Sequence, residues 1–189
     1  MKTEKNEQDD LMVVGNETVT VIDDRKPVPA GTYVAAIRLI ALLGSGDHFA
    51  SEAPRSAWMW VVRLPDGSHS TLTFLVNHNR LPIHEYAAAL AGDDSLLNRV
   101  SHCDANRIIG RSAMIEVLRQ AGGNGRDRPY VNRAWALPLG VEPIRLADAS
   151  VWQPTSRKPI PQYAPQWVRT YAEGAVALLW MGRKKGEEL

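Results

Sequence analysis

Apolar and polar side chains alternate along three stretches between residues 32 and 76, and this two-residue period predicts β-strands. The apolar positions expected to share one face are Tyr33, Ala35, Ile37 and Leu39 in the first stretch, Trp58, Trp60, Val62 and Leu64 in the second, and Leu72, Phe74 and Val76 in the third. A tight-turn signal, Pro65-Asp66-Gly67, separates the second stretch from the third, so these two are predicted to form a hairpin.

The apolar period lengthens after Pro82, which predicts an amphipathic helix that ends near Gly92. Its apolar positions are Ile83, Tyr86, Ala87 and Leu90. A second short helix is expected after Asp94 or Ser95. Two more strands are predicted near residues 112–119 and 130–137, joined by the glycine-rich basic turn AGGNGRDRP.

This element order predicts a mainly β fold, a five-stranded OB-fold barrel with a helix between strands 3 and 4. An SH3-like barrel or a small sandwich has similar strand counts, but the single central helix favours the OB-fold. We divide the chain into an acidic, partly disordered segment (1–24), the OB-fold domain (25–140) and an extended Pro-rich C-terminal arm (141–189). The arm is expected to carry a short helix over residues 166–181.

The net charge of +1 conceals an uneven distribution of charged side chains. Residues 1–24 carry two lysines and seven acidic residues, whereas residues 105–135 carry six arginines with only Glu116 and Asp127 as acids. This asymmetry is compatible with a local anion site, although two solvated faces of opposite charge would give the same pattern. A single cysteine and the lack of a leader or membrane-spanning apolar run lead us to expect a cytoplasmic protein with no membrane anchor.

Arginines and aromatic rings share the basic hairpin, and a binder of single-stranded nucleic acid uses these groups for phosphates and bases. The candidates for phosphate contact are Arg107, Arg111, Arg119, Arg126, Arg128 and Arg133. The candidates for base stacking are Trp58, Trp60, Tyr130 and Trp135. Burial in the barrel core is the alternative for Trp58 and Trp60, because their strand face continues into apolar residues. Arg38 and Arg63, on outward strand faces, would extend the groove.

The sequence offers little for catalysis. Its histidines have no metal-ligand spacing, and the paired carboxylates at 23–24 and 93–94 lie at turns where capping explains them. The segment AGGNGRDR lacks the lysine and the Ser/Thr of a phosphate loop. We therefore expect a non-catalytic protein with no cofactor and no bound metal.

Three short motifs resemble those of the phage-type OB-fold single-stranded DNA-binding proteins. They are Pro29/Gly31/Tyr33 at the entry to the first strand, Ile109/Gly110/Arg111 before the fourth, and Gly125/Arg126 with Tyr130 and Asn132 around the fifth. The resemblance covers roughly residues 27–140. It implies a replication or recombination accessory of a phage or mobile element that coats single-stranded DNA.

A second hypothesis is an OB-fold protein-interaction adaptor or assembly subunit. The aromatic residues of the segment 151–181 include Trp152, Tyr163, Trp167 and Trp180, which would dock on a protein partner or on a second copy of the chain. Self-association through this segment is expected under the first hypothesis as well, because single-strand binders commonly work as arrays.

Overall fold

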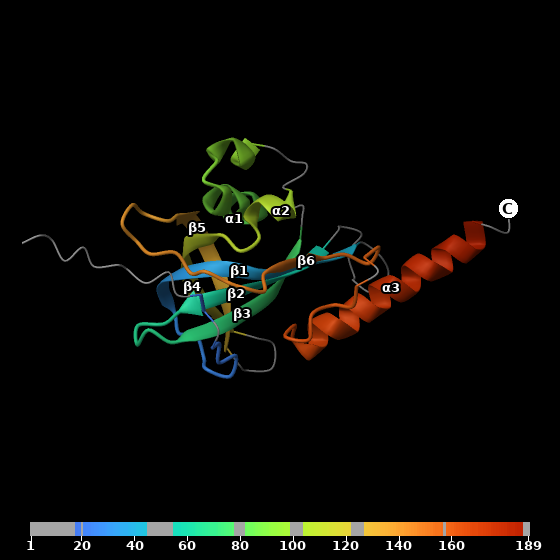
Figure 1. Ribbon diagram of the computed structural model, residues 1–189, viewed down its shortest axis with the longest axis horizontal. Helices are drawn as coiled ribbons and strands as arrows, with labels where there is room; N and C mark the ends of the chain where they lie inside the picture. The colour runs from blue at the N-terminus through green and yellow to red at the C-terminus, as the bar shows by residue number, and fades with distance from the viewer. Residues whose placement is uncertain are drawn as a thin grey trace, which may run out of the picture.

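The computed structural model describes residues 18–19, 21–44, 55–77, 82–98, 104–121, 127–156 and 158–186, which form a mainly β fold (Figure 1). The strands are β1 (Gly31–Gly44), β2 (Arg55–Arg63), β3 (His69–Asn77), β4 (Ser112–Ala121), β5 (Asp127–Ala136) and β6 (Ser150–Trp152). The helices are α1 (Pro82–Ala91), the 3₁₀ helix η1 (Asp94–Asn98), the one-turn α2 (Ala105–Ile108) and α3 (Gln166–Gly186). Most of the acidic segment 1–24 lies outside the described residues.

The sheet has the strand order β3-β2-β1-β4-β5, and every neighbouring pair along this path is antiparallel. The sixth strand, β6, pairs in parallel with β1. The predicted mainly β fold is confirmed, and residues 31–136 have the predicted order of three strands, a helical segment and two strands. The sheet is an open one of six strands where five were predicted, because β6 was not anticipated. The short α2 was not predicted; the Asp104 side chain caps it by accepting a hydrogen bond from the Asn106 backbone N–H.

The β2–β3 hairpin has the faces that its alternation predicted. Its core-facing pairs are Trp58 with Phe74 and Trp60 with Leu72. In the turn between the strands, Gly67 has a φ of 78°, a backbone conformation that residues with a Cβ rarely adopt. This hairpin therefore follows directly from the sequence.

In β1, the side-chain pattern reverses at Arg38. Ile37 and Leu39 are two residues apart, yet they lie opposite the adjacent residues Trp60 and Met59 of β2, so Arg38 is the extra residue of a β-bulge. Ile37 packs in the main core, and Leu39 packs on the opposite side of the sheet. The prediction that these two share a face is wrong, because one inserted residue reverses the alternation.

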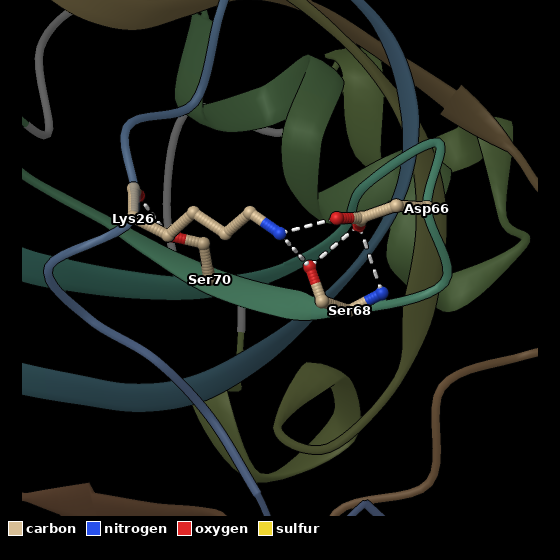
Figure 2. Close-up of polar contacts among 4 residues, drawn as sticks. All are labelled: Lys26, Asp66, Ser68 and Ser70. Atoms are coloured by element: carbon tan, nitrogen blue, oxygen red, sulfur yellow. Dashed lines mark hydrogen bonds and ion pairs between the residues drawn. The ribbon is translucent and has the colours of Figure 1, made fainter.

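Lys26 fastens the segment before β1 to the β2–β3 hairpin (Figure 2). Its ammonium group pairs with the Asp66 carboxylate and donates a hydrogen bond to Ser68 Oγ at 2.6 Å. Its carbonyl accepts a hydrogen bond from Ser70 Oγ at 2.5 Å. The pKa of the Asp66 carboxyl is lowered, first by the hydrogen bond from Lys26 and then by those from Ser68. Because an ammonium paired with a carboxylate acts as a donor and not as a base, we interpret this cluster as a structural clamp.

Residues after Gly140 form a layer over the outer face of β1 and β2, where an extended arm was expected. Ile144 packs on Ala36 and Val61, with Val34 and Leu146 at the margin. Further along, the sheet residues Leu39, Ala41, Leu43, Ala57 and Met59 are covered by Trp152, Ala164, Val168 and Ala172. This burial on the second face places the described residues between 141 and 176 within the folded body. The C-terminal part of α3 continues beyond the sheet (Figure 1).

The sixth strand completes an edge of β1 that β4 leaves unpaired. The ladder between β1 and β4 ends at Ala36, and the ladder between β1 and β6 covers residues 39–41 of β1. Between them, the Gly110 N–H donates to Ile37 O at 2.9 Å. Two separate segments, residues 110–117 and β6, thus share the hydrogen bonding along this edge of β1 and satisfy backbone groups that would otherwise be exposed.

Tyr86 of α1 connects the two outermost strands of the sheet. Its ring makes an edge contact with Phe74 of β3 at 6.4 Å between centroids, and its hydroxyl donates to Val131 O of β5 at 2.5 Å. Burial raises the pKa of the Tyr86 hydroxyl. Within the described residues no ladder joins β3 to β5. At this point the two edges are connected through a side chain of α1.

Replacing Tyr86 with Phe is expected to lower the free energy of unfolding by about 1–2 kcal/mol, because the Val131 carbonyl loses a buried donor. The measurement is urea unfolding at 25 °C. Tyr130→Phe is the matched control, since the Tyr130 hydroxyl has no hydrogen bond within the described residues. Equal losses in the two variants would contradict a connecting role for the Tyr86 hydroxyl.

Candidate nucleic-acid interface

The β4–β5 hairpin contains a second β-bulge, at Asn132. Glu116 lies opposite Arg133, but the next residue, Val117, lies opposite Val131, so Asn132 is an extra residue in β5. The Asn132 amide donates a hydrogen bond to Glu116 Oε2 at 2.6 Å. Side-chain alternation along β5 therefore reverses at this residue.

This reversal brings four of the predicted site residues to one face of the hairpin. The pairs across the two strands are Arg128 with Gln120, Tyr130 with Leu118, Arg133 with Glu116, and Trp135 with Met114. Directly paired side chains point to the same face, and the four β4 partners are spaced by two residues, so all of them share that face. Without the bulge, the side chains at 128 and 130 would lie on the opposite face from those at 133 and 135.

The face carries accessible rings and accessible positive charge. Arg128 and Arg133 are exposed, Trp135 is 40% exposed, and Tyr130 is half-buried. From Arg128 to Trp135 the face extends about 20 Å, at roughly 3.3 Å per strand residue. We refer to these four residues as the hairpin face. Its chemistry suits a flexible polyanion with planar groups, because rings stack on bases and guanidinium groups bind phosphates.

Trp58 and Trp60 are not part of this surface. They are 2% and 0% exposed, and they lie in the main core 6.2 Å apart between ring centroids. The Trp58 indole N–H donates to Ser56 Oγ at 2.8 Å inside the protein. A base could not stack on rings that are enclosed in this way, so burial removes both residues from the candidate interface.

The remaining predicted arginines occupy separate places. Arg107 of α2 forms an ion pair with Asp93 at 3.4 Å, and the pKa of Asp93 is lowered, first by hydrogen bonds from Ser95 and then by Arg107. Arg119 is exposed but lies opposite Pro129, on the other face of the hairpin. Arg126 lies outside the described residues.

Arg38 and Arg63 hold the C-terminal layer on the sheet, although both were predicted to extend the groove. The Arg38 Nε donates to Asp148 Oδ1 at 3.0 Å, and its guanidinium carbon lies 4.0 Å from the centroid of the Tyr163 ring. The Arg63 guanidinium donates to the Glu142 carbonyl at 3.1 Å. Their hydrogen-bonding capacity is directed to the protein's own chain.

Arg111 lines a hollow at the start of β4, together with a second exposed arginine, Arg145. Sequence reasoning missed Arg145, because it belongs to the segment interpreted as an arm. Nothing in its local sequence indicates that residues 144–146 fold back against β1. Its proximity to Arg111 is a consequence of tertiary structure alone.

A scan against protein-family models matched none of them, and a search of curated protein sequences found no relative. Among the described residues, no helix is long and apolar enough to cross a membrane. The same part of the chain contains no group of three or more His, Cys, Asp or Glu side chains arranged to hold a metal ion.

Proposed function

We propose that this protein binds single-stranded DNA without catalysing a reaction, and that its hairpin face provides the principal contacts. The observation that carries the proposal is the β-bulge at Asn132, because it places two arginines and two aromatic rings on one face of β5. Phosphates of a bound strand would lie against Arg128 and Arg133, while bases would stack on Trp135 and the accessible part of Tyr130.

The topology supports a domain of the OB type. In that fold a helix separates strands 3 and 4, as α1, η1 and α2 do here, and the first strand pairs with both the second and the fourth. OB-folds bind oligonucleotides on the face of strands 2 and 3 and at the loops between strands 1 and 2 and between strands 4 and 5. The hairpin face leads toward the loop between strands 4 and 5. A replication or recombination accessory of a phage or mobile element, acting in the cytoplasm, is the role that fits these properties.

The test is fluorescence anisotropy of a labelled dT oligonucleotide of about 30 nucleotides, a length that spans several typical OB-fold site sizes. Affinity should fall steeply between 50 and 300 mM salt, because each neutralised phosphate contributes about −0.7 to the slope of log K against log salt on single strands. Tryptophan emission should be quenched through Trp135. If no binding occurs at 50 mM salt, the proposal fails.

A second candidate, a protein-interaction adaptor, is favoured by one observation on α3. Trp167 and Tyr171 are each 36% exposed and pack edge to face, 6.1 Å apart between centroids. Trp152 and Tyr163 contribute to the fold itself: Trp152 is 4% exposed, and the Tyr163 hydroxyl donates to the Asp148 carbonyl at 2.8 Å. The Trp180 side chain lies outside the described part of the structure. Among the aromatic side chains of residues 151–181 that are described, a docking role would therefore depend on the exposed pair of α3.

A further inference from the structure

The hollow beside Arg111 has a volume of about 400 Å³ and opens to the surface. Its lining residues are Leu90, Gly110, Arg111, Ser112, Pro143, Ile144, Arg145 and Leu146. They come from the end of α1, the entry to β4 and the C-terminal layer. This volume falls within the range typical of small-ligand sites, about 300–1,000 Å³.

Ser112 and Ile144 form the connection that builds the hollow. The Ser112 hydroxyl accepts a hydrogen bond from the Ile144 N–H at 2.9 Å and donates one to the Ile144 carbonyl at 3.1 Å. Ile144 itself is 1% exposed and packs on the sheet. Arg111 and Arg145 directly adjoin these two residues, so the paired hydrogen bonds hold both arginines at the same hollow.

The backbone of both arginines is also fixed from other directions. The Arg111 carbonyl accepts from the Ile37 N–H at 3.2 Å, and the Arg145 carbonyl accepts from the Val19 N–H at 2.9 Å. Neither guanidinium group forms an ion pair with another described residue. No lining residue is acidic. The hollow therefore presents two cations on fixed backbone, and no acidic residue lines it to compensate their charge.

We infer that this hollow binds the phosphate of a nucleotide, with Arg111 and Arg145 as its ligands. Two guanidinium groups suit a phosphate because each offers a planar fork of donors to its oxygens. The apolar side chains of Pro143 and Leu146 provide a surface for the attached sugar or base. That the phosphate comes from a bound DNA strand rests on the proposed function; a free nucleotide would offer the same group.

The hollow lies beyond the Trp135 end of the hairpin face, at the start of β4. Ser112 is two residues before Met114 on β4, so its side chain lies on the same face as Met114 and Trp135, whereas Arg111 precedes it at the edge of that face. Arg111 is three residues before Met114, or about 10 Å along the strand. A single strand that leaves Trp135 along β4 would reach the hollow next.

The test combines Arg111→Gln and Arg145→Gln in the full chain and measures dT binding from 50 to 300 mM salt. The slope of log K against log salt should become less negative by about 1.4, since two phosphate contacts of about 0.7 each are removed. Quenching through Trp135 should remain. Arg25→Gln with Lys158→Gln is the control, because both residues are exposed, lie outside the hollow, and remove the same charge.

A second arm titrates thymidine 5′-monophosphate and thymidine against the wild type and both double variants. The phosphate site is supported if thymidine 5′-monophosphate binds, thymidine does not, and only Arg111→Gln/Arg145→Gln loses this binding. That result would identify a free nucleotide as a sufficient source of the phosphate, even if the oligonucleotide is not bound. Oligonucleotide binding with a slope that matches the Arg25→Gln/Lys158→Gln control, together with no binding of the monophosphate, would overturn the hollow and leave the proposed function standing. Failure of both ligands with the wild type would overturn both.

Discussion

Combining Arg128→Gln, Arg133→Gln and Trp135→Ala is expected to lower the affinity for single-stranded DNA at least 100-fold. Loss of one stacked base contributes about 1–3 kcal/mol, and the two lost phosphate contacts add to it. A total of about 3 kcal/mol corresponds to a factor of more than 100 in the dissociation constant. Because all three side chains are exposed, the thermal midpoint of unfolding should change little.

The matched control combines Arg25→Gln, Lys158→Gln and Trp167→Ala. It removes two exposed positive charges and one exposed indole ring from other parts of the chain, so net charge and tryptophan count stay equal between the variants. Anisotropy with the dT oligonucleotide should show the loss only for the hairpin-face variant. Equal losses would indicate diffuse electrostatic attraction, and the assignment of the hairpin face would then be wrong.

Trp60→Ala is expected to lower the free energy of unfolding by about 3–5 kcal/mol, the usual cost of truncating a buried Trp or Phe to Ala. Trp60 is 0% exposed, and its ring meets Tyr86 edge to face at 5.9 Å and Trp58 at 6.2 Å. The truncation would leave a cavity at the centre of this aromatic cluster. Such a loss is a large part of the total stability of a typical domain, about 5–15 kcal/mol.

Urea unfolding at 25 °C measures the effect, with Trp167→Ala as the control for loss of a partly exposed tryptophan. The control should lose less than about 1 kcal/mol. Trp60→Phe keeps an aromatic ring at the site and should lie between the two, which gives a readable result if Trp60→Ala does not fold. Equal destabilisation by Trp60→Ala and Trp167→Ala would show that Trp60 is not central to the core.

The two bulges mark the limit of what alternation can predict. The stretch GTYVAAIRLIALLG of β1 is apolar on both faces, so an inserted residue at Arg38 leaves no visible break in its pattern. In β5, Val131 is the only fully buried side chain, and the segment around Asn132 has no sustained alternation to interrupt. A bulge depends on the register of the neighbouring strand, which is a property of the pair. The chemistry of the side chains was therefore enough to identify the predicted site residues. The sequence could not show that four of them share one face of the hairpin.

The C-terminal layer could have been anticipated from β1 and β2. Both strands are apolar at positions of both parities, and Ala36, Met59 and Val61 lie on the side away from the main core. Strands that are apolar on both faces are typical of sheets covered on both sides. The proline content of residues 138–165 suggested an extended arm. Proline disfavours regular helix and central strands, but it does not prevent a segment from packing on a sheet. The length of the C-terminal helix was also underestimated, since α3 continues to Gly186 through Gly174.

The pairing of β1 with β6 determines how late in synthesis this fold can be completed. Leu39 lies opposite Ser150, so more than a hundred residues separate the partners along the chain. At about 5–20 residues per second, a ribosome needs roughly 5–20 s to bridge that interval. During this time the C-terminal layer does not yet cover the apolar outer face of β1 and β2. Residues 39–41 of β1 also lack β6 as their hydrogen-bonding partner. The nascent chain therefore exposes an aggregation-prone apolar surface until the residues of the C-terminal layer have been translated.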